Sequence, residues 1–449
     1  MQFDASELAQ ATRGECVQPG PKGNICTDTR HLKEGDWFLA IVGERFDGHS
    51  FCAQAREINV AGIIGQHVPE GWDKGFIRVT DSITALQNIA RSIRKQFTGL
   101  VVGITGSAGK TTTRALVTSV LSQKGRVLAT EGNFNNHIGL PLTLLRSELT
   151  EDYWVLEMGM NHLGEIHLLQ EIAQPHIRLI TNVGAAHLEG VGSLEGVAKA
   201  KGEIFDGAHM GDLCVRNADD GKIMAHPLPQ GVRTIEYGTS QTASIQITNA
   251  HIDANTLHTE ITLHTPEGDF AVSLPSPGIH LASNVASAVA IGLDQKCSLA
   301  EIQKGVAEYV PVGARLLVEQ GAKGSKWIND AYNANPLSMR ASLHTLSVLE
   351  GHTRIALLGD MLELGDHGEE AHREILEYAL SLNIEKIGVC GNIFSQIAKK
   401  ITSSKLFSAS NSTELGALLA QEITDGSLIL LKGSRGVRME KARTVWEET

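Results

Sequence analysis

The sequence predicts an α/β protein with three domains. A chain of 449 residues is too long to fold around a single hydrophobic core. From about residue 100 onward, short apolar strand segments alternate with amphipathic helical segments, which is typical of parallel sheets covered by helices on both faces. Changes in this pattern divide the chain into expected domains at residues 1–98, 99–312 and 313–449.

The two outer domains show different patterns. Residues 1–98 mix short apolar runs with turn-rich segments and close on helical apolar spacing over 83–97, which predicts a small N-terminal α/β domain. After Arg315, strands and helices alternate again, and this alternation predicts a C-terminal Rossmann-like domain. Its expected strands are residues 354–359, 386–391 and 427–433.

The central domain is expected to carry a parallel sheet wound on both sides. A strand, a glycine-rich loop and a helix with one apolar face follow one another from Leu100. Further strands are expected at residues 153–159 and 177–184. A β-rich insert is expected over residues 232–274, with a hairpin turn at residues 265–268.

Composition excludes several classes of protein. The formal net charge of -12 argues against a non-specific nucleic-acid binder, because affinity for phosphate backbones comes largely from clustered lysine and arginine. No apolar stretch approaches the ~18 residues of a membrane span, so a cytoplasmic protein without a membrane span is expected, as a monomer. The six cysteines lack CxxC spacing, which predicts buried free thiols rather than disulfides or a zinc site.

The segment 103–112 departs from the strict phosphate-loop pattern, which would place a glycine at Ile104. Glycines let backbone N–H groups approach phosphate oxygens, and the following helix N-terminus adds its positive end. We therefore predict a nucleotide site in a central parallel-sheet P-loop ATPase domain, the alternative being a glycine-rich turn with a solvent lysine. The candidates are Gly106, Ser107, Ala108, Gly109, Lys110, Thr111 and Thr112, with Lys110 on the β/γ-phosphates and Thr111 on a metal ion.

Two polar residues follow apolar strands of the central domain. Glu157 ends one strand segment, and His187 follows the next. Open α/β sheets bind ligands at the carboxyl ends of their strands, and a magnesium nucleotide needs carboxylate ligands. We predict Glu157 as a metal ligand and His187 as a site residue. Solvated surface positions are the alternative for both.

Lys201 lies on the apolar face of a predicted helix over residues 193–206. It stands four residues after Val197 and three before Ile204, whereas Lys199 falls off this face. An inward lysine is costly unless it is paired or neutralised, so either its side chain passes the apolar face to reach water or its amine has a chemical role. One such role is carbamylation by carbon dioxide, which creates a carboxylate-like metal ligand.

Polar residues also gather around strand ends in the third domain. Arg315 offers a cation for a γ-phosphate or its transferred form. Two later loops carry side chains that can hydrogen-bond a ligand or meet a carboxylate. Turn formation and solvation are the alternatives. The candidates are Asp330, Asn333, Asn335, Lys432 and Arg435.

The loop glycines and the residues after them match, one by one, the GxxGxxGKT[ST] loop of the Mur ligase family, and the chain resembles this family over essentially its whole length. Some segments resemble the members that add a D-alanyl-D-alanine dipeptide, and the Asp-Asn-Pro-Arg motif expected of diaminopimelate-adding members is absent from the sequence. These segments are residues 130–145, 156–166, 329–339, 357–365 and 430–440.

The resemblance implies an ATP-dependent carboxylate-amine ligase of peptidoglycan synthesis. ATP would phosphorylate the terminal carboxylate of a UDP-N-acetylmuramoyl-tripeptide, and the amine of D-Ala-D-Ala would attack the acyl phosphate. The implied cofactors are ATP and two Mg²⁺ ions, one served by Thr111 and Glu157 and the other by His187 and a carbamylated Lys201.

Other roles follow from the same resemblance. Arg315 would contact the γ-phosphate, Asp330 the ribose, and Asn284 with His280 the adenine, although Leu281 stands where the family has asparagine. The segment 27–51 resembles the uridine-nucleotide domain. Its candidates are Thr29, Arg30, Phe46, Asp47, Gly48 and His49, and those for the dipeptide are Asn333, Asn335, Lys432 and Arg435.

Three alternative functions stay open on the sequence: another Mur-type or folylpolyglutamate ligase, a non-catalytic ATP-binding regulatory protein, and a P-loop kinase or GTPase. A non-catalytic protein derived from such an enzyme should have lost at least one site residue. The last alternative leaves the first and third domains unexplained. The residues that argue against a non-catalytic protein are Lys110, Thr111, Glu157, His187, Lys201 and Arg315.

Overall fold

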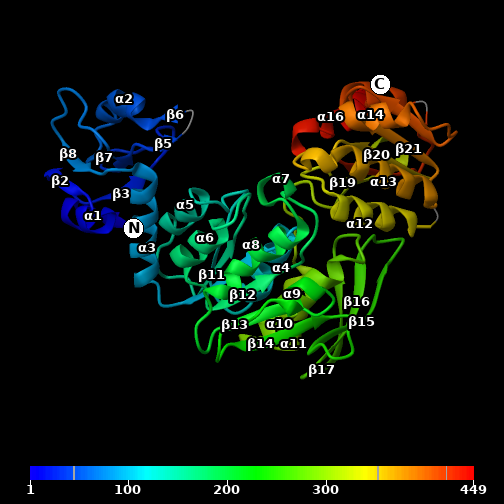
Figure 1. The fold of residues 1–449 in the computed structure, drawn as a ribbon, viewed down its shortest axis with the longest axis horizontal. Helices are drawn as coiled ribbons and strands as arrows, with labels where there is room; N and C mark the ends of the chain where they lie inside the picture. Colours follow the sequence, from blue (N-terminus) through cyan, green and yellow to red (C-terminus); the bar gives the residue numbers. More distant parts are fainter. Residues whose placement is uncertain (44–45, 351–352, 421, 449) are drawn as a thin grey trace. The chain divides into compact units, whose positions relative to one another are not determined.

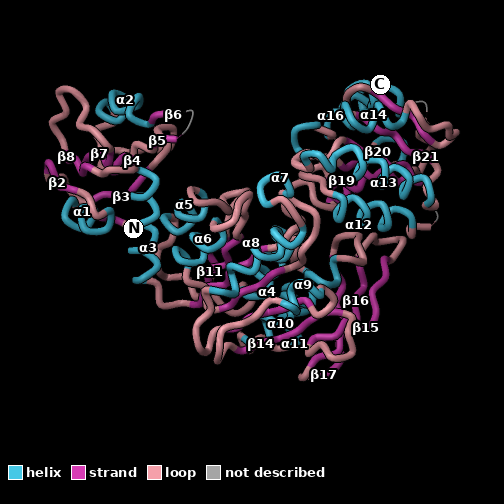
Figure 2. The backbone as a smooth tube through the Cα atoms, in the orientation of Figure 1, coloured by secondary structure: helices cyan, strands magenta, loops and turns pink. Residues whose placement is uncertain are grey.

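The computed structural model describes residues 1–43, 46–350, 353–420 and 422–448. The chain folds into two compact units (Figures 1 and 2). Unit 1 consists of Met1–Gly103, Gly125–Gly159 and Glu165–His176, and unit 2 of Ile104–Lys124, Met160–Gly164 and Ile177–Thr449. The division into three domains at residues 98 and 312 stays a prediction.

Unit 1 begins with a six-stranded sheet of order β1-β3-β4-β7-β8-β2. Its inner strands run parallel and its two edge strands antiparallel, and Trp37, Phe38 and Ile63 are fully buried around it. The strands are β1 (Gln2–Phe3), β2 (Glu15–Gln18), β3 (Gly23–Cys26), β4 (Trp37–Leu39), β7 (Gly62–Gly65) and β8 (Gly75–Arg78), with the hairpin β5 (Val42–Gly43) and β6 (Phe46–Asp47). The helices are α1 (Ala5–Thr12), the 3-10 helix η1 (Gly48–Phe51), α2 (Cys52–Glu57) and α3 (Ser82–Gln96).

Unit 1 also holds the first strands of the central sheet, in the order β10-β11-β9. β10 and β11 run parallel, and the buried Trp154 of β11 stacks on Phe97 with ring centres 3.9 Å apart. The elements are β9 (Leu100–Thr105), β10 (Val127–Ala129), α5 (Gly139–Leu145), β11 (Tyr153–Glu157) and α6 (Glu165–Ala173). β9 continues into unit 2 through Ile104 and Thr105.

Unit 2 carries the strand order β12-β13-β14-β15-β16-β17. The pairs from β12 to β15 are parallel, and the last three strands form an antiparallel meander whose final turn joins Thr265 to Gly268, as predicted. The predicted β-rich insert thus extends the parallel sheet. The strands are β12 (Ile177–Ile180), β13 (Leu213–Asn217), β14 (Arg233–Gly238), β15 (Ile245–Ile252), β16 (Thr259–Thr265) and β17 (Gly268–Leu274). The helices are α4 (Lys110–Leu121), α7 (Leu188–Val191), α8 (Leu194–Asp206), α9 (Gly221–Ala225), α10 (Leu281–Asp294) and α11 (Leu299–Ala307).

The C-terminal part of unit 2 is a second sheet of order β18-β19-β23-β20-β21-β22, which confirms the Rossmann-like prediction. Among the described strands of this sheet, only β18 runs antiparallel to its neighbour. All six residues of β20 are buried, as expected for a strand covered on both faces. The strands are β18 (Leu317–Gln320), β19 (Lys326–Asp330), β20 (Arg354–Gly359), β21 (Lys386–Cys390), β22 (Leu406–Ala409) and β23 (Leu428–Lys432). The helices are η2 (Ala322–Gly324), α12 (Pro336–Ser347), η3 (Gly365–His367), α13 (Gly368–Ser381), α14 (Asn392–Ala398), α15 (Ser412–Leu419), η4 (Arg435–Val437) and α16 (Glu440–Glu448).

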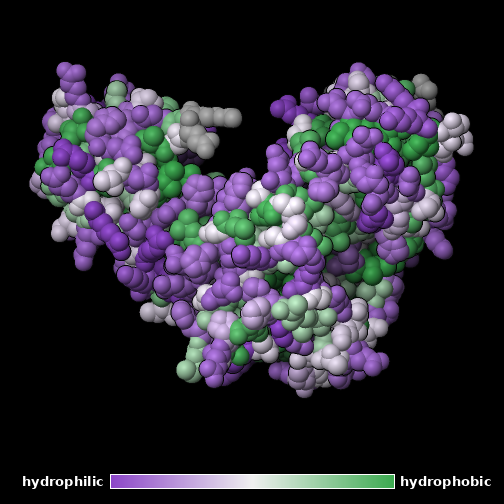
Figure 3. Space-filling model, in the orientation of Figure 1, coloured by the Kyte–Doolittle hydropathy of each residue, from purple (hydrophilic) through white to green (hydrophobic). Residues whose placement is uncertain are grey.

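The six cysteines differ in their exposure to solvent. All six cysteines are free thiols, but the prediction that they are buried is wrong for Cys16, which is exposed on the edge strand β2, and Cys26 on β3 is only partly buried. An edge strand lacks a neighbour on one side, and the sequence does not mark β2 as an edge. The face in Figure 3 is mainly hydrophilic, and no helix in the described ranges is long and apolar enough to cross a membrane.

Candidate active site

The predicted phosphate loop joins β9 to α4, and two of its glycines are required by geometry. Gly106 has φ 152°, and a Cβ there would lie 1.8 Å from the Thr181 Oγ1. Gly109 has φ 77°, and a Cβ there would lie 2.5 Å from the Asn284 Nδ2. Only glycine fits both positions without strain. Two of the glycines that predicted a phosphate-binding loop are therefore required by its backbone conformation and close contacts.

The segment after β12 holds this loop in place. The Ser107 N–H donates to the Asn182 carbonyl (3.0 Å), and the Ala108 N–H donates to the Asn182 Oδ1 (2.9 Å). The Thr181 hydroxyl donates to the Ala108 carbonyl (2.6 Å), and the Lys110 amine donates to the Gly106 carbonyl (2.7 Å). These bonds aim the start of α4, whose N-terminal positive end attracts anions.

Asn284 and Thr112 also belong to the surroundings of the loop. The Asn284 amide donates to the Thr113 hydroxyl (2.7 Å) and more weakly to the Gly109 carbonyl (3.4 Å). Thr112 is buried and hydrogen-bonds the Tyr309 hydroxyl just beyond α11. Asn284, predicted for the adenine pocket, thus supports the phosphate loop through its amide. His280 precedes α10 as an exposed residue.

Lys201 is buried in α8, with 1% of its surface exposed, while Lys199 on the same helix is exposed. Its amine has no hydrogen bond or ion pair within the part of the chain that the structure describes. Burial, and then the nearby charge of Lys110, lowers the pKa of Lys201 well below its ordinary value. The lysine therefore does not reach past the apolar face to water, and burial favours the neutral form of its amine.

His187 lies in the same neighbourhood. Burial, and then the charges of Lys110 and Lys201, lowers the pKa of His187 to about 4, so the imidazole is neutral at neutral pH. It precedes α7 with φ 57°, and its Nδ1 lies 3.5 Å from the Glu363 Oε2. Neutral imidazole and neutral amine are the forms from which a metal ligand and a carbamate are made.

Glu157 ends β11 in unit 1 and is buried, with 3% of its surface exposed. Its Oε1 accepts a hydrogen bond from the Asn135 amide (2.8 Å), and its N–H donates to the Thr130 hydroxyl (3.0 Å). The carboxylate is thus oriented from within its own unit. Asn135 was not among the predicted site residues, although it lies in the segment 130–145 that carries part of the resemblance.

Arg315 is held by two contacts. Its guanidinium lies over the Tyr332 ring, 3.7 Å from the ring centre, and donates to the Val312 carbonyl (3.0 Å). Stacking on an aromatic face restricts a side chain that would otherwise be mobile. Tyr332 was not among the predicted site residues, and only its position in the segment 329–339 marks it.

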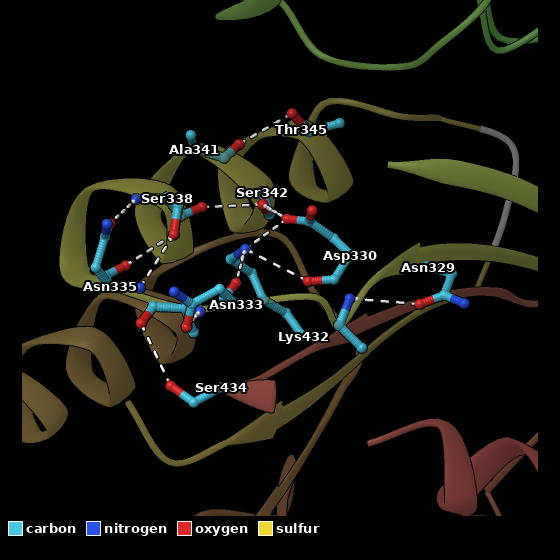
Figure 4. A network of polar contacts seen from close by, with 12 residues as sticks. Asn329, Asp330, Asn333, Asn335, Ser338, Ala341, Ser342, Thr345, Lys432 and Ser434 are labelled. Atoms are coloured by element: carbon cyan, nitrogen blue, oxygen red, sulfur yellow. Dashed lines mark hydrogen bonds and ion pairs between the residues drawn. The ribbon is translucent and has the colours of Figure 1, made fainter. Parts of the chain in front are cut away.

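Four candidates in the C-terminal part of unit 2 belong to one connected polar network (Figure 4), namely Asp330, Asn333, Asn335 and Lys432. The Lys432 ammonium bonds the Asp330 carboxylate at 2.6 Å and the Asn333 carbonyl at 3.1 Å. Asn335 caps α12 by accepting from the Ser338 N–H (2.9 Å) and makes a long bond from its amide to the Ser107 carbonyl (3.5 Å). Arg435 lies apart from these residues, with its side chain 67% exposed and paired with Glu440.

The predicted uridine-nucleotide residues lie in the first part of unit 1. His49 accepts the Gln66 N–H at Nε2 (3.0 Å) and therefore donates from Nδ1 to Asp47 (2.7 Å). This side chain is almost fully buried, so it supports the loop. Gly48 packs against the backbone at Ile41, Phe46 and Arg30 are exposed, and Thr29 is half-buried. Two bonds from Arg30 hold the pKa of the Asp28 carboxyl well below its usual range.

Comparison with known proteins identifies the class. Residues 104–292 match the family described as Mur ligase middle domain, and residues 314–435 match Mur ligase, glutamate ligase domain. The chain is 37% identical over 428 residues to the UDP-N-acetylmuramoyl-tripeptide–D-alanyl-D-alanine ligase of Escherichia coli (strain K12), a match that covers 94% of this chain and 93% of that protein. The chain therefore belongs to the Mur ligase family.

Solved structures extend the similarity to the N-terminal residues, which neither family description covers. MurF from Acinetobacter baumannii is similar with a TM-score of 0.93 at 31% identity, covering 100% of this chain and 99% of that one. MurF ligase from Thermotoga maritima in complex with ADP is similar with a TM-score of 0.85 at 28% identity, covering 95% and 97%. The match that covers 100% of this chain includes residues 27–51 as well as the glycine-rich loop.

Proposed function

We propose that this protein is an ATP-dependent ligase that adds D-Ala-D-Ala to UDP-N-acetylmuramoyl-tripeptide, forming a peptide bond and releasing ADP and phosphate. The product would be the UDP-muramoyl-pentapeptide precursor of peptidoglycan, made in the cytoplasm by a monomer. The observation that carries the proposal is the buried Lys201 amine, which has no hydrogen bond or ion pair among the described residues and feels the charge of Lys110 in a phosphate loop. Relatives that match nearly the whole chain bear the name of this activity.

Each step of the proposed chemistry has candidate residues. The terminal carboxylate of the tripeptide attacks the γ-phosphorus of ATP, one P–O bond forms as another breaks, and ADP leaves. The amine of D-Ala-D-Ala then forms the C–N bond, and phosphate leaves with the oxygen that joined it to the acyl carbon. Lys110 and Arg315 would offset the charge that develops on the transferred group.

The metal candidates fit magnesium by their chemistry. Glu157 is a buried carboxylate, Thr111 follows the loop lysine, and His187 is neutral. No group of three or more His, Cys, Asp and Glu side chains in the described ranges is arranged to hold a metal, and the proposed set uses a threonine hydroxyl and a modified lysine instead. Magnesium would neutralise phosphate charge and orient the phosphates.

Carbamylation of Lys201 completes this set. The neutral amine attacks the carbon of carbon dioxide, an N–C bond forms, and one proton passes to solvent, leaving a carbamate anion. The modification replaces a buried amine, whose charged form would be costly there, by an oxygen ligand. His187 and the carbamate would serve one magnesium ion, and Thr111 and Glu157 the other.

The remaining candidates bind the organic substrates. The nucleotide would be held by the phosphate loop, with Asp330 on the ribose and Asn284 near the adenine. The uridine part of the tripeptide would meet Thr29, Arg30, Phe46, Asp47, Gly48 and His49. For the dipeptide the candidates are Asn333, Asn335, Lys432 and Arg435.

Phosphate release tests this function. Enzyme, ATP, magnesium and the UDP-muramoyl tripeptide are incubated with D-Ala-D-Ala, with free diaminopimelate, or without an amine. Release only with D-Ala-D-Ala, together with the pentapeptide mass, supports the proposal. Release with another amine keeps the family and changes the substrate, and release without any amine contradicts ligation.

A further inference from the structure

The amine of Lys432 is enclosed by protein acceptors. The side chain ends β23 with 2% of its surface exposed. Its ammonium donates to the Asp330 Oδ2 (2.6 Å), to the Asn333 carbonyl (3.1 Å) and, more weakly, to the Asp330 carbonyl (3.5 Å). An ammonium has three protons, and here each has an acceptor within the protein (Figure 4).

Asp330 connects this amine to a helix. Its Oδ2 also accepts a hydrogen bond from the Ser342 hydroxyl of α12 (2.6 Å). β19 and β23 are neighbours in the sheet, with Asp330 paired to Lys432 in the register. The ion pair therefore joins the ends of two strands and the helix that follows one of them, and removing the ammonium would leave a buried carboxylate without its cation.

The loop 331–335 between β19 and α12 depends on these contacts. Lys432 holds the carbonyl of Asn333 in its middle, and the N-cap bond of Asn335 fixes its end. The loop carries Tyr332, whose ring supports the guanidinium of Arg315. A shift of the loop would move both the arginine and the Asn335 amide, which reaches toward the phosphate loop.

We propose that Lys432 is a positioning residue, which with Asp330 sets the loop 331–335 and through it Arg315, and that it makes no contact with the carboxylate of the dipeptide. The proposal rests on the proposed function and replaces one of its candidate contacts. Arg435, which is three residues further along the chain and exposed, is a cation that a carboxylate can reach.

The test removes the charge of Lys432, of Arg435 and of the dipeptide carboxylate in turn. kcat/KM is measured for D-Ala-D-Ala and for its C-terminal amide, with the unmodified enzyme, Lys432→Met, Arg435→Met and, as a matched surface control, Lys304→Met. All enzymes are assayed well below their unfolding temperatures, so a purely structural role of Lys432 would leave kcat unchanged. Where Lys432→Met does not fold, Lys432→Gln, whose amide can still donate to Asp330, takes its place.

The positioning role predicts that Lys432→Met lowers kcat on the order of 100-fold with both substrates. The ratio of kcat/KM for D-Ala-D-Ala to kcat/KM for its amide then stays equal, within about twofold, in this variant and in the unmodified enzyme. If this ratio is about tenfold smaller in Lys432→Met, Lys432 contacts the carboxylate directly and the proposal is overturned. An unchanged kcat would also overturn it. An unmodified enzyme that does not use D-Ala-D-Ala would instead contradict the proposed function.

Discussion

The guanidinium carbon of Arg315 lies 3.7 Å from the centre of the Tyr332 ring, and its Nη1 donates to the Val312 carbonyl at 3.0 Å. The stacked ring and the carbonyl together hold the cation, and no carboxylate among the described residues pairs with it. An arginine kept in this way retains its charge for an anionic ligand. This arrangement suits the γ-phosphate contact proposed for Arg315.

Replacing Tyr332 tests whether the stack matters. Tyr332→Phe keeps an aromatic face, whereas Tyr332→Leu removes it, so we expect only the leucine variant to lose about 1 kcal/mol of transition-state stabilisation, or about fivefold in kcat/KM for ATP. Steady-state kinetics with varied ATP measure the difference. Equal losses in the two variants would show that the hydroxyl or the volume matters and not the stack.

Lys201 provides the sharpest test of the carbamate. We expect Lys201→Ala to lose activity on the order of 100-fold or more, because a metal ligand disappears, and to regain part of it with added short carboxylic acids. Lys199→Ala, an exposed lysine of the same helix, is the control and should be unaffected. The native enzyme in ¹³C-labelled bicarbonate should show a carbamate resonance that Lys201→Ala lacks. Near-normal activity without any response to acids would exclude the role.

The phosphate loop should not tolerate a methyl group at Gly106. The built Cβ lies 1.8 Å from the Thr181 Oγ1 at φ 152°, so Gly106→Ala must shift the loop and strain its backbone. We expect a loss of about 2 kcal/mol in the free energy of unfolding, and weaker binding of ADP by calorimetry. Gly221→Ala, where nothing lies within 4 Å, should change neither. Normal ADP affinity in Gly106→Ala would contradict the phosphate role of this loop.

His372 should make the protein sensitive to acid. It is fully buried, accepts the Met361 N–H at Nε2 (2.8 Å) and donates from Nδ1 to the Gly368 carbonyl (2.6 Å). Burial lowers the pKa of His372 below its ordinary 6.5, although the Asp360 carboxylate 3.6 Å away opposes the shift. The unfolded chain therefore takes up a proton near pH 6.5 that the folded chain refuses until lower pH.

The free energy of unfolding should consequently fall as the pH drops below about 6.5, by up to about 1.4 kcal/mol per unit until the folded pKa is reached. Denaturant unfolding at pH 7.5 and 5.5 measures this fall. His372→Gln should be less stable at pH 7.5 but show a smaller difference between the two values. The exposed His251→Gln serves as the control. An identical pH dependence in His372→Gln would refute the assignment.

Local patterns were enough to predict much of the fold. Apolar runs and glycine turns depend on neighbouring residues, so strands such as β9, β11 and β12 and the hairpin at Thr265–Gly268 are confirmed. The same reasoning predicted the inward direction of Lys201 from its helical spacing. Its alternative, a side chain that reaches water, is excluded by its burial.

Contacts between residues that are far apart in the chain could not be predicted from local sequence patterns. Lys432 finds its acceptors about a hundred residues earlier in the chain, because β19 and β23 are neighbours in the sheet but not in sequence. The bond of Asn135 to Glu157 likewise joins residues that are 22 positions apart in the chain. Long-range pairing is set by topology, so the polar groups could be predicted from the sequence but their partners could not.

The most direct test of the ligase account follows one oxygen atom. The UDP-muramoyl tripeptide is labelled with ¹⁸O in its terminal carboxylate and converted with ATP, magnesium and D-Ala-D-Ala, and the released phosphate is examined by mass spectrometry. An acyl phosphate intermediate predicts one ¹⁸O in each phosphate and a pentapeptide product. Unlabelled phosphate would mean that water or another group attacked ATP, and the central claim would be wrong.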